Sequence, residues 1–326
     1  MGTLALSENQ SLKKYQKPAL SYCEQVDLMR RRGLKIDNEE RARQFLSYAN
    51  YYRFSGYAFI FQDKTDGDLF FDGVSFEQIR ALYNFDRALR LLVAEGVSTI
   101  EIYARTQIAH YIATKYGPFG HLQASTFQNA NKQFIKESEW RKWLKKAQDS
   151  VRYDGVCTAP SQHFKKNYLG WPDLPIWFLT EILNFGSLHV LFSLLLPADQ
   201  KKIARQFNLN NGSTLSSWLR LLCIVRNICA HYGRLWNRNL RTAPEFPQDK
   251  RWNALRSKAG KPFAFLTIIN YLLACVGEKT SVESSWNARF AELWSARPML
   301  AENNDAFFSE QTGFPANWAN LELWKN

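Results

Sequence analysis

The stretch SFEQIRALYNFDRALRLLVAEGVSTIEIYARTQIAHYIATKYGP, from Ser75 to Pro118, decides the fold class. Its apolar residues recur three or four positions apart, which is the period of an α-helix. Ser75 is a favourable N-cap, Glu77 places an acid in the first turn, and Gly117 with Pro118 stops the pattern. The stretch therefore predicts one long helix, or two helices with a break near Gly96.

The same helical period marks most of the remaining chain, while the alternation typical of strands is nearly absent. Only residues 57–61 and 69–71 are candidates for short strands. The sequence therefore predicts an all-α protein. The further helices are expected at residues 22–32, 39–48, 137–150, 176–196, 198–207, 215–232 and 263–276.

A segment rich in glycine and proline, residues 153–175, is the best candidate for a connection within the chain. It would join an N-terminal helical half, residues 1–152, to a C-terminal helical half, residues 176–326. We expect the two halves to form one compact unit.

The composition is that of a folded protein with a basic surface. Of 326 residues, 46% are hydrophobic and 22% are charged, which excludes disorder and low complexity. Lysine and arginine exceed aspartate and glutamate by 12, and residues 201–251 alone hold ten basic and two acidic residues. Together with 15% aromatic residues, this charge indicates a nucleic-acid or other acidic partner.

The five cysteines are scattered and form no CxxC pair, so we expect reduced thiols in a cytoplasmic protein. The N-terminus lacks the basic and apolar regions of a signal peptide. The apolar segment 174–197 contains Glu181 and His189, so a buried helix is favoured over a membrane span, and no membrane partner is expected. No metal-ligand spacing or glycine-rich phosphate loop occurs, so neither a metal nor a cofactor is predicted.

The strongest local motif is Arg226-Asn227-Ile228-Cys229-Ala230-His231, which closes the apolar run 219–225. At about 100° per residue, Asn227 and His231 lie within about 40° of each other on one helix face. Arg226 lies at the edge of that face. We expect Gly233 to end this helix, so the three polar residues would occupy its last turns.

This trio can bind a phosphodiester and move its proton without a metal. Arginine presents a permanently charged fork that matches phosphate oxygens, and histidine exchanges protons near neutral pH. The attacking group would be the 2′-hydroxyl of RNA. Arg226 would stabilise the transition state and His231 would act as general acid or base. The alternative is structural, because basic residues at a helix C-terminus also complement the helix dipole.

The string RNICAHYGRLWNR, residues 226–238, resembles the R-x4-6-H signature of HEPN ribonucleases and the hallmark of Abi-like proteins of the AbiD and AbiF type. Further resemblances to that family lie in LMRRRGLKI (28–36), YANYYRFSGY (48–57), YGPFGH (116–121), PIWFLTEILNFGSL (175–188) and GFPANWANLELW (313–324). The resemblance implies a HEPN-type helical bundle with additional N- and C-terminal helices, a role in abortive infection against phage, and RNA as substrate.

A second R-x4-H, from Arg105 to His110, lies in the long first helix. HEPN nucleases build one active site from two such motifs, and the related type VI CRISPR effectors carry both on one chain. Two arrangements are therefore open. Arg105 and His110 could face Arg226 and His231 within the chain, or a second copy of the chain could complete the site in a homodimer. The structural alternative is that Arg105 and His110 belong to a packed helix face.

Glu181 is a further candidate for the site, since a carboxylate in an apolar helix needs a partner and Arg226 could supply it. The alternative is a partly exposed surface residue. RNA outside the cleavage centre would contact basic residues and stacking aromatic rings. These candidates are Lys201, Lys202, Arg205, Tyr232, Arg234, Trp236, Arg238 and Arg241.

The resulting prediction is a metal-independent endoribonuclease, a toxin of abortive infection. The first alternative is a non-catalytic RNA-binding module that holds a structured or guide-like non-coding RNA. The second is a helical factor that binds a phage or host protein.

Overall fold

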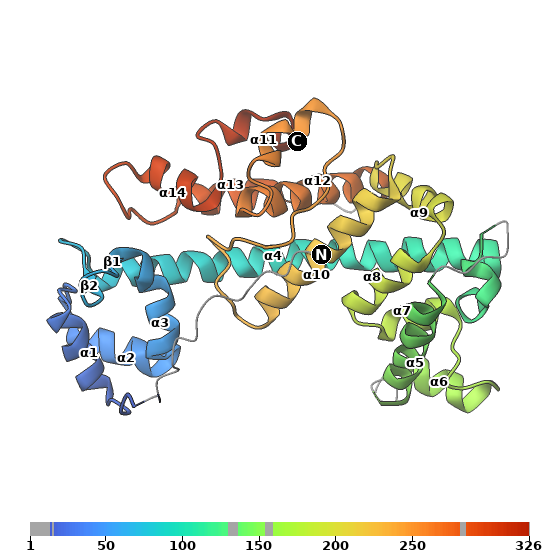
Figure 1. Ribbon diagram of the computed structural model, residues 1–326, viewed down its shortest axis with the longest axis horizontal. Coiled ribbons are helices and arrows are strands. Elements are labelled where there is room, and N and C mark those ends of the chain that lie inside the picture. Colours follow the sequence, from blue (N-terminus) through green and yellow to red (C-terminus); the bar gives the residue numbers. More distant parts are fainter. Residues whose placement is uncertain (1–13, 15, 130–135, 154–158, 281–284, 326) are drawn as a thin grey trace, which may run out of the picture. The chain divides into compact units, whose positions relative to one another are not determined.

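The computed structural model describes residues 14, 16–129, 136–153, 159–280 and 285–325. Over these residues the chain forms fourteen α-helices, several short 3-10 turns and one two-stranded sheet (Figure 1). The predicted all-α class is confirmed. The chain divides into two compact units, a small unit of residues 1–81 and a large unit of residues 82–326.

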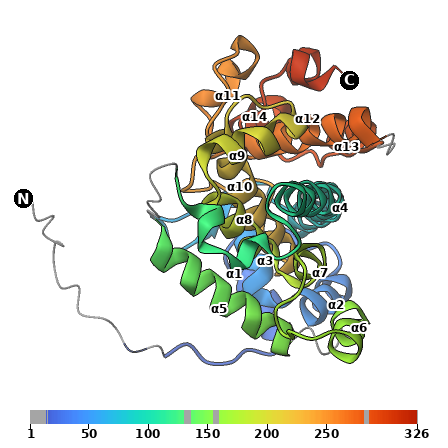
Figure 2. The ribbon, with the colours of Figure 1, turned by 90° about the vertical axis from the view of Figure 1, so that its right-hand side faces the viewer.

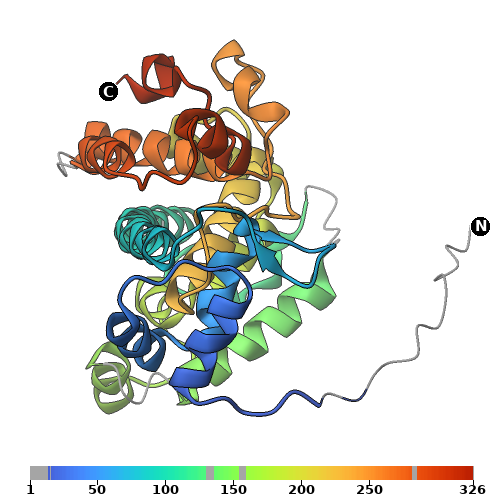
Figure 3. The same cartoon turned by 90° about the vertical axis from the view of Figure 1, so that its left-hand side faces the viewer.

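The small unit contains three short helices and the hairpin (Figure 3). Ser21 and Glu24 form a capping box at its first helix, and Asn38 and Asn50 cap the next two. Phe54 stacks on Phe76 with ring centroids 4.8 Å apart, so aromatic packing forms the centre of this unit. The elements are α1 (Tyr22–Arg31), α2 (Glu39–Ala49), α3 (Tyr51–Ala58), η1 (Phe59–Phe61), β1 (Gln62–Asp63) and β2 (Leu69–Phe70).

The strands are shorter than predicted, and one is displaced along the chain. Residues 57–61 complete α3 and η1, and β1 follows them at Gln62–Asp63. The two strands are antiparallel, with Gln62 opposite Phe70. The aromatic run that suggested a strand is therefore used for helix packing instead.

Helix α4 (Phe76–Tyr116) is continuous through Gly96, so the predicted stretch is one helix without a break. Gly96 allows a close contact rather than a bend. An added Cβ would lie 2.8 Å from Nε1 of Trp286, and that indole nitrogen donates a hydrogen bond to the carbonyl of Leu92. The missing side chain therefore admits Trp286 against the helix backbone.

In the large unit, α12 and α13 lie on one side of α4, and α5, α6 and α7 lie on the other (Figures 1 and 2). The elements after α4 are η2 (Gly120–Leu122), η3 (Ala124–Phe127), α5 (Glu137–Tyr153), α6 (Ala159–Asn167), α7 (Ile176–Ile182), α8 (Phe185–Leu194), α9 (Pro197–Ala204), η5 (Arg205–Phe207), α10 (Gly212–Ala230), η6 (Lys250–Trp252), α11 (Asn253–Arg256), α12 (Pro262–Thr280), α13 (Trp286–Ser295), α14 (Asn304–Thr312), η7 (Trp318–Asn320) and η8 (Glu322–Trp324).

The single helix predicted over residues 176–196 is wrong, because the structure has two helices there. Asn184 accepts a hydrogen bond from the backbone N–H of Ser187 at 2.9 Å and so caps α8. An asparagine at this position starts a new helix, while the apolar residues on both sides retain a helical period.

The division into units also differs from the predicted halves. It falls at Ala81 and Leu82, within α4, whereas part of the glycine- and proline-rich segment forms α6. Residues 154–158 of that segment lie outside the described residues.

Helix α12 forms the core of the C-terminal part of the large unit. Among the described residues it is the one helix long and apolar enough to cross a membrane, but 67% of its apolar window is buried inside the protein. The side chain of Asn270 donates to the carbonyl of Leu323, and Trp324 donates to Thr267. These polar contacts bind the C-terminal segment to α12, as expected for a core helix.

Four of the five cysteines fall within the described residues, and all four are free. Cys229 and Cys275 are buried, Cys223 is partly buried, and Cys23 is exposed. Cys157 lies outside the described residues.

Candidate functional site

The polar motif lies at the C-terminal end of α10, where Arg226, Asn227 and His231 are all exposed. His231 is the C-cap, and its backbone N–H donates to the carbonyl of Asn227 at 2.9 Å. The guanidinium of Arg226 lies 3.5 Å from the side-chain oxygen of Asn227. The helix end therefore presents a cation, an amide and an imidazole to a molecule approaching from solvent.

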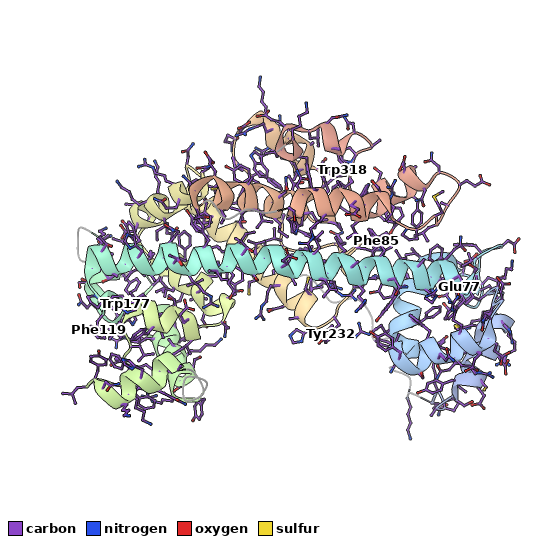
Figure 4. The ribbon with its side chains drawn as sticks, turned by 180° about the vertical axis from the view of Figure 1, so that it is seen from behind. Glu77, Phe85, Phe119, Trp177, Tyr232 and Trp318 are labelled. Atoms are coloured by element: carbon purple, nitrogen blue, oxygen red, sulfur yellow. The ribbon has the colours of Figure 1, made fainter. Side chains whose placement is uncertain are left out.

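The turn after the motif is made by Tyr232 rather than by Gly233. Helix α10 ends at Ala230, and Tyr232 adopts a left-handed conformation with φ of +56°. Gly233 then donates its N–H to the carbonyl of Ile228 at 2.8 Å, and an added Cβ would lie 3.1 Å from a methyl group of Ile228. Glycine is thus used for close approach, and the aromatic ring of Tyr232 is left exposed (Figure 4).

Beyond this turn, a buried carboxylate of α4 anchors the chain. Asp86 is 0% exposed and accepts hydrogen bonds from the backbone N–H groups of Leu235, at 3.1 Å, and Trp236, at 2.7 Å. Its other oxygen pairs with Arg90 at 2.5 Å. Sequence reasoning missed this arrangement, although an aspartate and an arginine four residues apart in an apolar helix are the signal of a buried pair.

The turn between α7 and α8, residues 183–184, leads into Gly186 of α8, which lies against α10 one turn before the motif. Cys223, one turn before Asn227, lies 3.5 Å from the position that a Cβ on Gly186 would take. Asn227 Nδ2 is 3.9 Å from the sulfur of Cys223. Burial raises the pKa of the Cys223 thiol, the nearby Glu101 raises it further, and Arg226 lowers it. Glu101 of α4 is therefore close to the motif.

Arg105 holds this α7–α8 turn in place. Its guanidinium donates to the carbonyls of Thr180 and Leu183 and pairs with Glu101. The side chain is 13% exposed. Arg105 therefore binds the C-terminal carbonyls of α7, a structural contact that helices commonly make with basic side chains.

Of the second R-x4-H motif, Arg105 pairs with Glu101, which is near Cys223 of α10, whereas His110 lies farther along α4. His110 is exposed on α4, 24 residues beyond Asp86, which corresponds to about 36 Å along the helix axis. The chain that leaves His231 reaches Asp86 only four residues later. Figure 4 shows the corresponding separation between Tyr232, beside the middle of α4, and Phe119, just beyond its C-terminal end. The pairing of His110 with His231 within one chain therefore stays a prediction, and the place where the chain after His231 meets α4 does not favour it.

Glu181 is exposed in the last turn of α7, so the expectation of a buried carboxylate that orients Arg226 is wrong. The side chain next to Arg226 is that of Asn227. A glutamate in an otherwise apolar helix needs no ion-pair partner when its side chain is exposed, because water solvates the carboxylate.

The predicted RNA-binding residues divide between the two ends of α10. Lys201 lies beside Gly212, at the start of this helix, whereas Arg234 and Arg238 follow its end. The helix has 19 residues and is therefore about 28 Å long. All of the predicted basic residues except the partly buried Arg234 are exposed; the exposed set is Lys201, Lys202, Arg205, Arg238 and Arg241.

Trp236 cannot serve as a stacking surface, so that prediction is wrong. Its side chain is 1% exposed and packs on Phe307 and Phe308 of α14. Tyr232, at 68% exposed, remains the aromatic ring available beside the motif. The sequence could not separate them, because both rings flank the same turn.

A cavity of about 780 Å³ lies at the opposite end of α10, beside Asn211 and Thr214. Its two arginines are occupied, since Arg251 pairs with Asp249 and Arg256 donates to the carbonyl of Pro247. Both arginines among the described residues that line the cavity already have partners, so the C-terminal end of α10 is the better candidate site.

A family model described as "Abi-like protein" matches residues 44–237, which is more than half of the chain. The match ends within the segment that follows α10, so it includes the whole polar motif. No curated protein and no solved structure matches the chain.

Proposed function

Because the chain belongs to the Abi-like family, we propose that it is a metal-independent endoribonuclease of the HEPN type that acts in abortive infection. Family membership itself supports a function of the abortive-infection type. The observation that carries the finer proposal is the exposed trio Arg226, Asn227 and His231 at the end of α10. A polymer such as RNA needs a centre that is open to solvent on at least one side.

The proposed reaction is an internal transesterification. An imidazole takes the proton of the 2′-hydroxyl, whose oxygen attacks the adjacent phosphorus, and the bond to the 5′-oxygen of the next nucleotide breaks. A second acid returns a proton to that oxygen. The products are a 2′,3′-cyclic phosphate and a free 5′-hydroxyl. Arg226 binds the phosphate oxygens and stabilises their charge in the transition state, and Asn227 orients the same group.

The second acid is proposed to come from a second copy of α10 in a homodimer. Within one chain His110 lies about 36 Å along α4 from Asp86, where the chain after His231 is bound, and Arg105 is bound to the carbonyls of α7. A two-fold axis beside the helix end would instead bring two copies of His231 to one phosphate. Tyr232, Arg238 and Arg241 would bind the flanking RNA, either substrate or a bound non-coding RNA.

The test of catalysis is cleavage of total RNA in EDTA by purified protein. His231→Ala and Arg226→Ala should each lower the rate by about two to three orders of magnitude while the protein stays folded, because each removes one transition-state contact. His110→Ala is the matched control and should retain the wild-type rate. Wild-type cleavage by a folded His231→Ala protein would contradict the proposal.

The test of the dimer is the concentration dependence of the specific activity. If two chains build one site, activity per chain should rise with protein concentration and saturate where sedimentation shows a dimer. A monomer with constant specific activity would exclude the shared site and leave only an intrachain centre.

A further inference from the structure

Asp86 is the most deeply buried charged residue beside the motif, and nothing in the proposed chemistry uses it. Its carboxylate accepts hydrogen bonds from Arg90 and from the backbone N–H groups of Leu235 and Trp236. A buried carboxylate is costly unless its oxygens are bonded in this way. Four described hydrogen bonds reach the two oxygens, so they fix the orientation of the carboxylate in addition to balancing its charge.

The two backbone donors belong to the segment that returns from the end of α10. Only three residues separate His231 from Leu235, and the first of these, Tyr232, is in the left-handed conformation. Residues 232–234 must therefore join the end of α10 to a segment whose N–H groups are bound by the carboxylate of Asp86 on α4. Trp236 adds a further constraint, because its ring is buried against α14.

We propose that Asp86 is a positioning residue, which holds residues 233–236 against α4 and thereby fixes where His231 and Arg234 stand relative to a bound phosphate. Arg90 pairs with this carboxylate and orients it, and has no contact with the reacting group in the proposed chemistry. The inference rests on the proposed ribonuclease function, since the position of His231 matters only if it acts on RNA. It adds a residue from α4 to a site whose other residues come from α10 and the segment that follows it.

The experiment replaces the pair rather than one member. Asp86→Leu with Arg90→Met removes both charges and keeps similar volumes, a change that buried ion pairs often tolerate, so the remaining cost is that two backbone N–H groups lose their acceptor. The double variant should unfold cooperatively, as wild type does. Hydrogen exchange at the amides of Leu235 and Trp236 should become faster, because both lose their acceptor. The kcat for RNA cleavage should fall by about 10²-fold with KM changed much less, since a displacement of about 1 Å has that effect.

Asp86→Glu provides a second variant that keeps the pair with Arg90 and moves the carboxylate by one methylene. It should retain protected amides at Leu235 and Trp236 and recover most of the lost kcat. Tyr111→Phe is the matched control, because it removes one hydrogen bond from another buried carboxylate, Asp199, and leaves the motif untouched. It should cut RNA at the wild-type rate.

A folded double variant with wild-type kcat, or with unchanged exchange at both amides, would overturn the inference. If wild-type protein cuts no RNA, the proposed function fails instead. The positioning role of Asp86 is then tested by hydrogen exchange at the two amides and by the affinity for a 2′-O-methyl oligoribonucleotide, which cannot be cleaved. Faster exchange with weaker affinity would support positioning, and no change in either would exclude it.

Discussion

His121, in η2, shows how one buried side chain can make stability depend on pH. The imidazole is 0% exposed and lies edge-on to Trp143, while its backbone carbonyl accepts a hydrogen bond from Trp140. Burial lowers the pKa of His121 from its ordinary 6.5 to about 4. The ring is therefore neutral in the folded protein at neutral pH.

The sign of the effect follows from this depressed pKa. Between pH 6.5 and 4 the unfolded chain binds a proton at His121 and the folded chain does not, so the free energy of unfolding falls as the pH falls. The loss should approach about 3 kcal/mol by pH 4. Urea unfolding between pH 7 and 4.5 measures it. His121→Gln should flatten the dependence, and an unchanged dependence in that variant would assign it to other groups.

At the same scale, the relative positions of the candidate residues on a helix were easier to predict from the sequence than their burial. Helical spacing predicts that Asn227 and His231 share one face with Arg226 at its edge, but the exposure of that face is seen only in the structure. Burial of Trp236 and exposure of Glu181 depend on which neighbouring elements pack there. Trp236 packs on α14, which is distant in the sequence, so no local pattern could show that it is buried.

At the scale of elements, α4 was predictable because its apolar period runs without interruption for eleven turns. The role of Gly96 could not be predicted, because a glycine weakens a helix but also allows a neighbouring side chain to approach its backbone closely. The contact with Trp286 decides between these two roles. The break between α7 and α8 is the converse case, since one capping asparagine ended an apolar run that still had the helical period.

Gly96→Ala should destabilise the large unit by about 1–3 kcal/mol, because the new methyl group would overlap the indole of Trp286. Gly56→Ala in α3 is the matched control. An added Cβ at Gly56 meets nothing within 4 Å, so the substitution should stabilise its helix by about 0.5–1 kcal/mol. Thermal unfolding of both variants checks the contrast, and equal shifts would show that helix propensity alone governs both sites.

At the scale of the whole molecule, the proposed RNA partner is consistent with the net charge of +12, but the linear sequence overstated how concentrated that charge is. The basic segment 201–251 contains the full length of α10, whose two ends lie about 28 Å apart. Arg238 and Arg241 follow one end, and Lys201 lies at the other. A single short RNA contact would therefore use only part of this charge.

RNA affinity should fall steeply with salt, because bound phosphates release counterions. Arg238→Glu with Arg241→Glu should weaken binding of a short oligoribonucleotide and reduce the slope of log affinity against log salt by about 2. Lys201→Glu with Lys202→Glu should affect the same oligonucleotide much less. Fluorescence titrations at several salt concentrations measure both. Equal effects of the two pairs would mean that the RNA spans the length of α10.

At the end of α10, the left-handed conformation of Tyr232 lowers stability, while the exposed ring of this residue is proposed to bind RNA. A bulky residue in this conformation is strained by about 1 kcal/mol or more, and glycine would adopt it freely. The chain nevertheless places a largely exposed aromatic ring here, and its glycine one residue later. Thermal tolerance alone would favour the exchange of tyrosine for glycine. Selection of this protein for heat resistance in the laboratory should therefore enrich changes at Tyr232, and the more robust proteins should be the poorer binders of RNA.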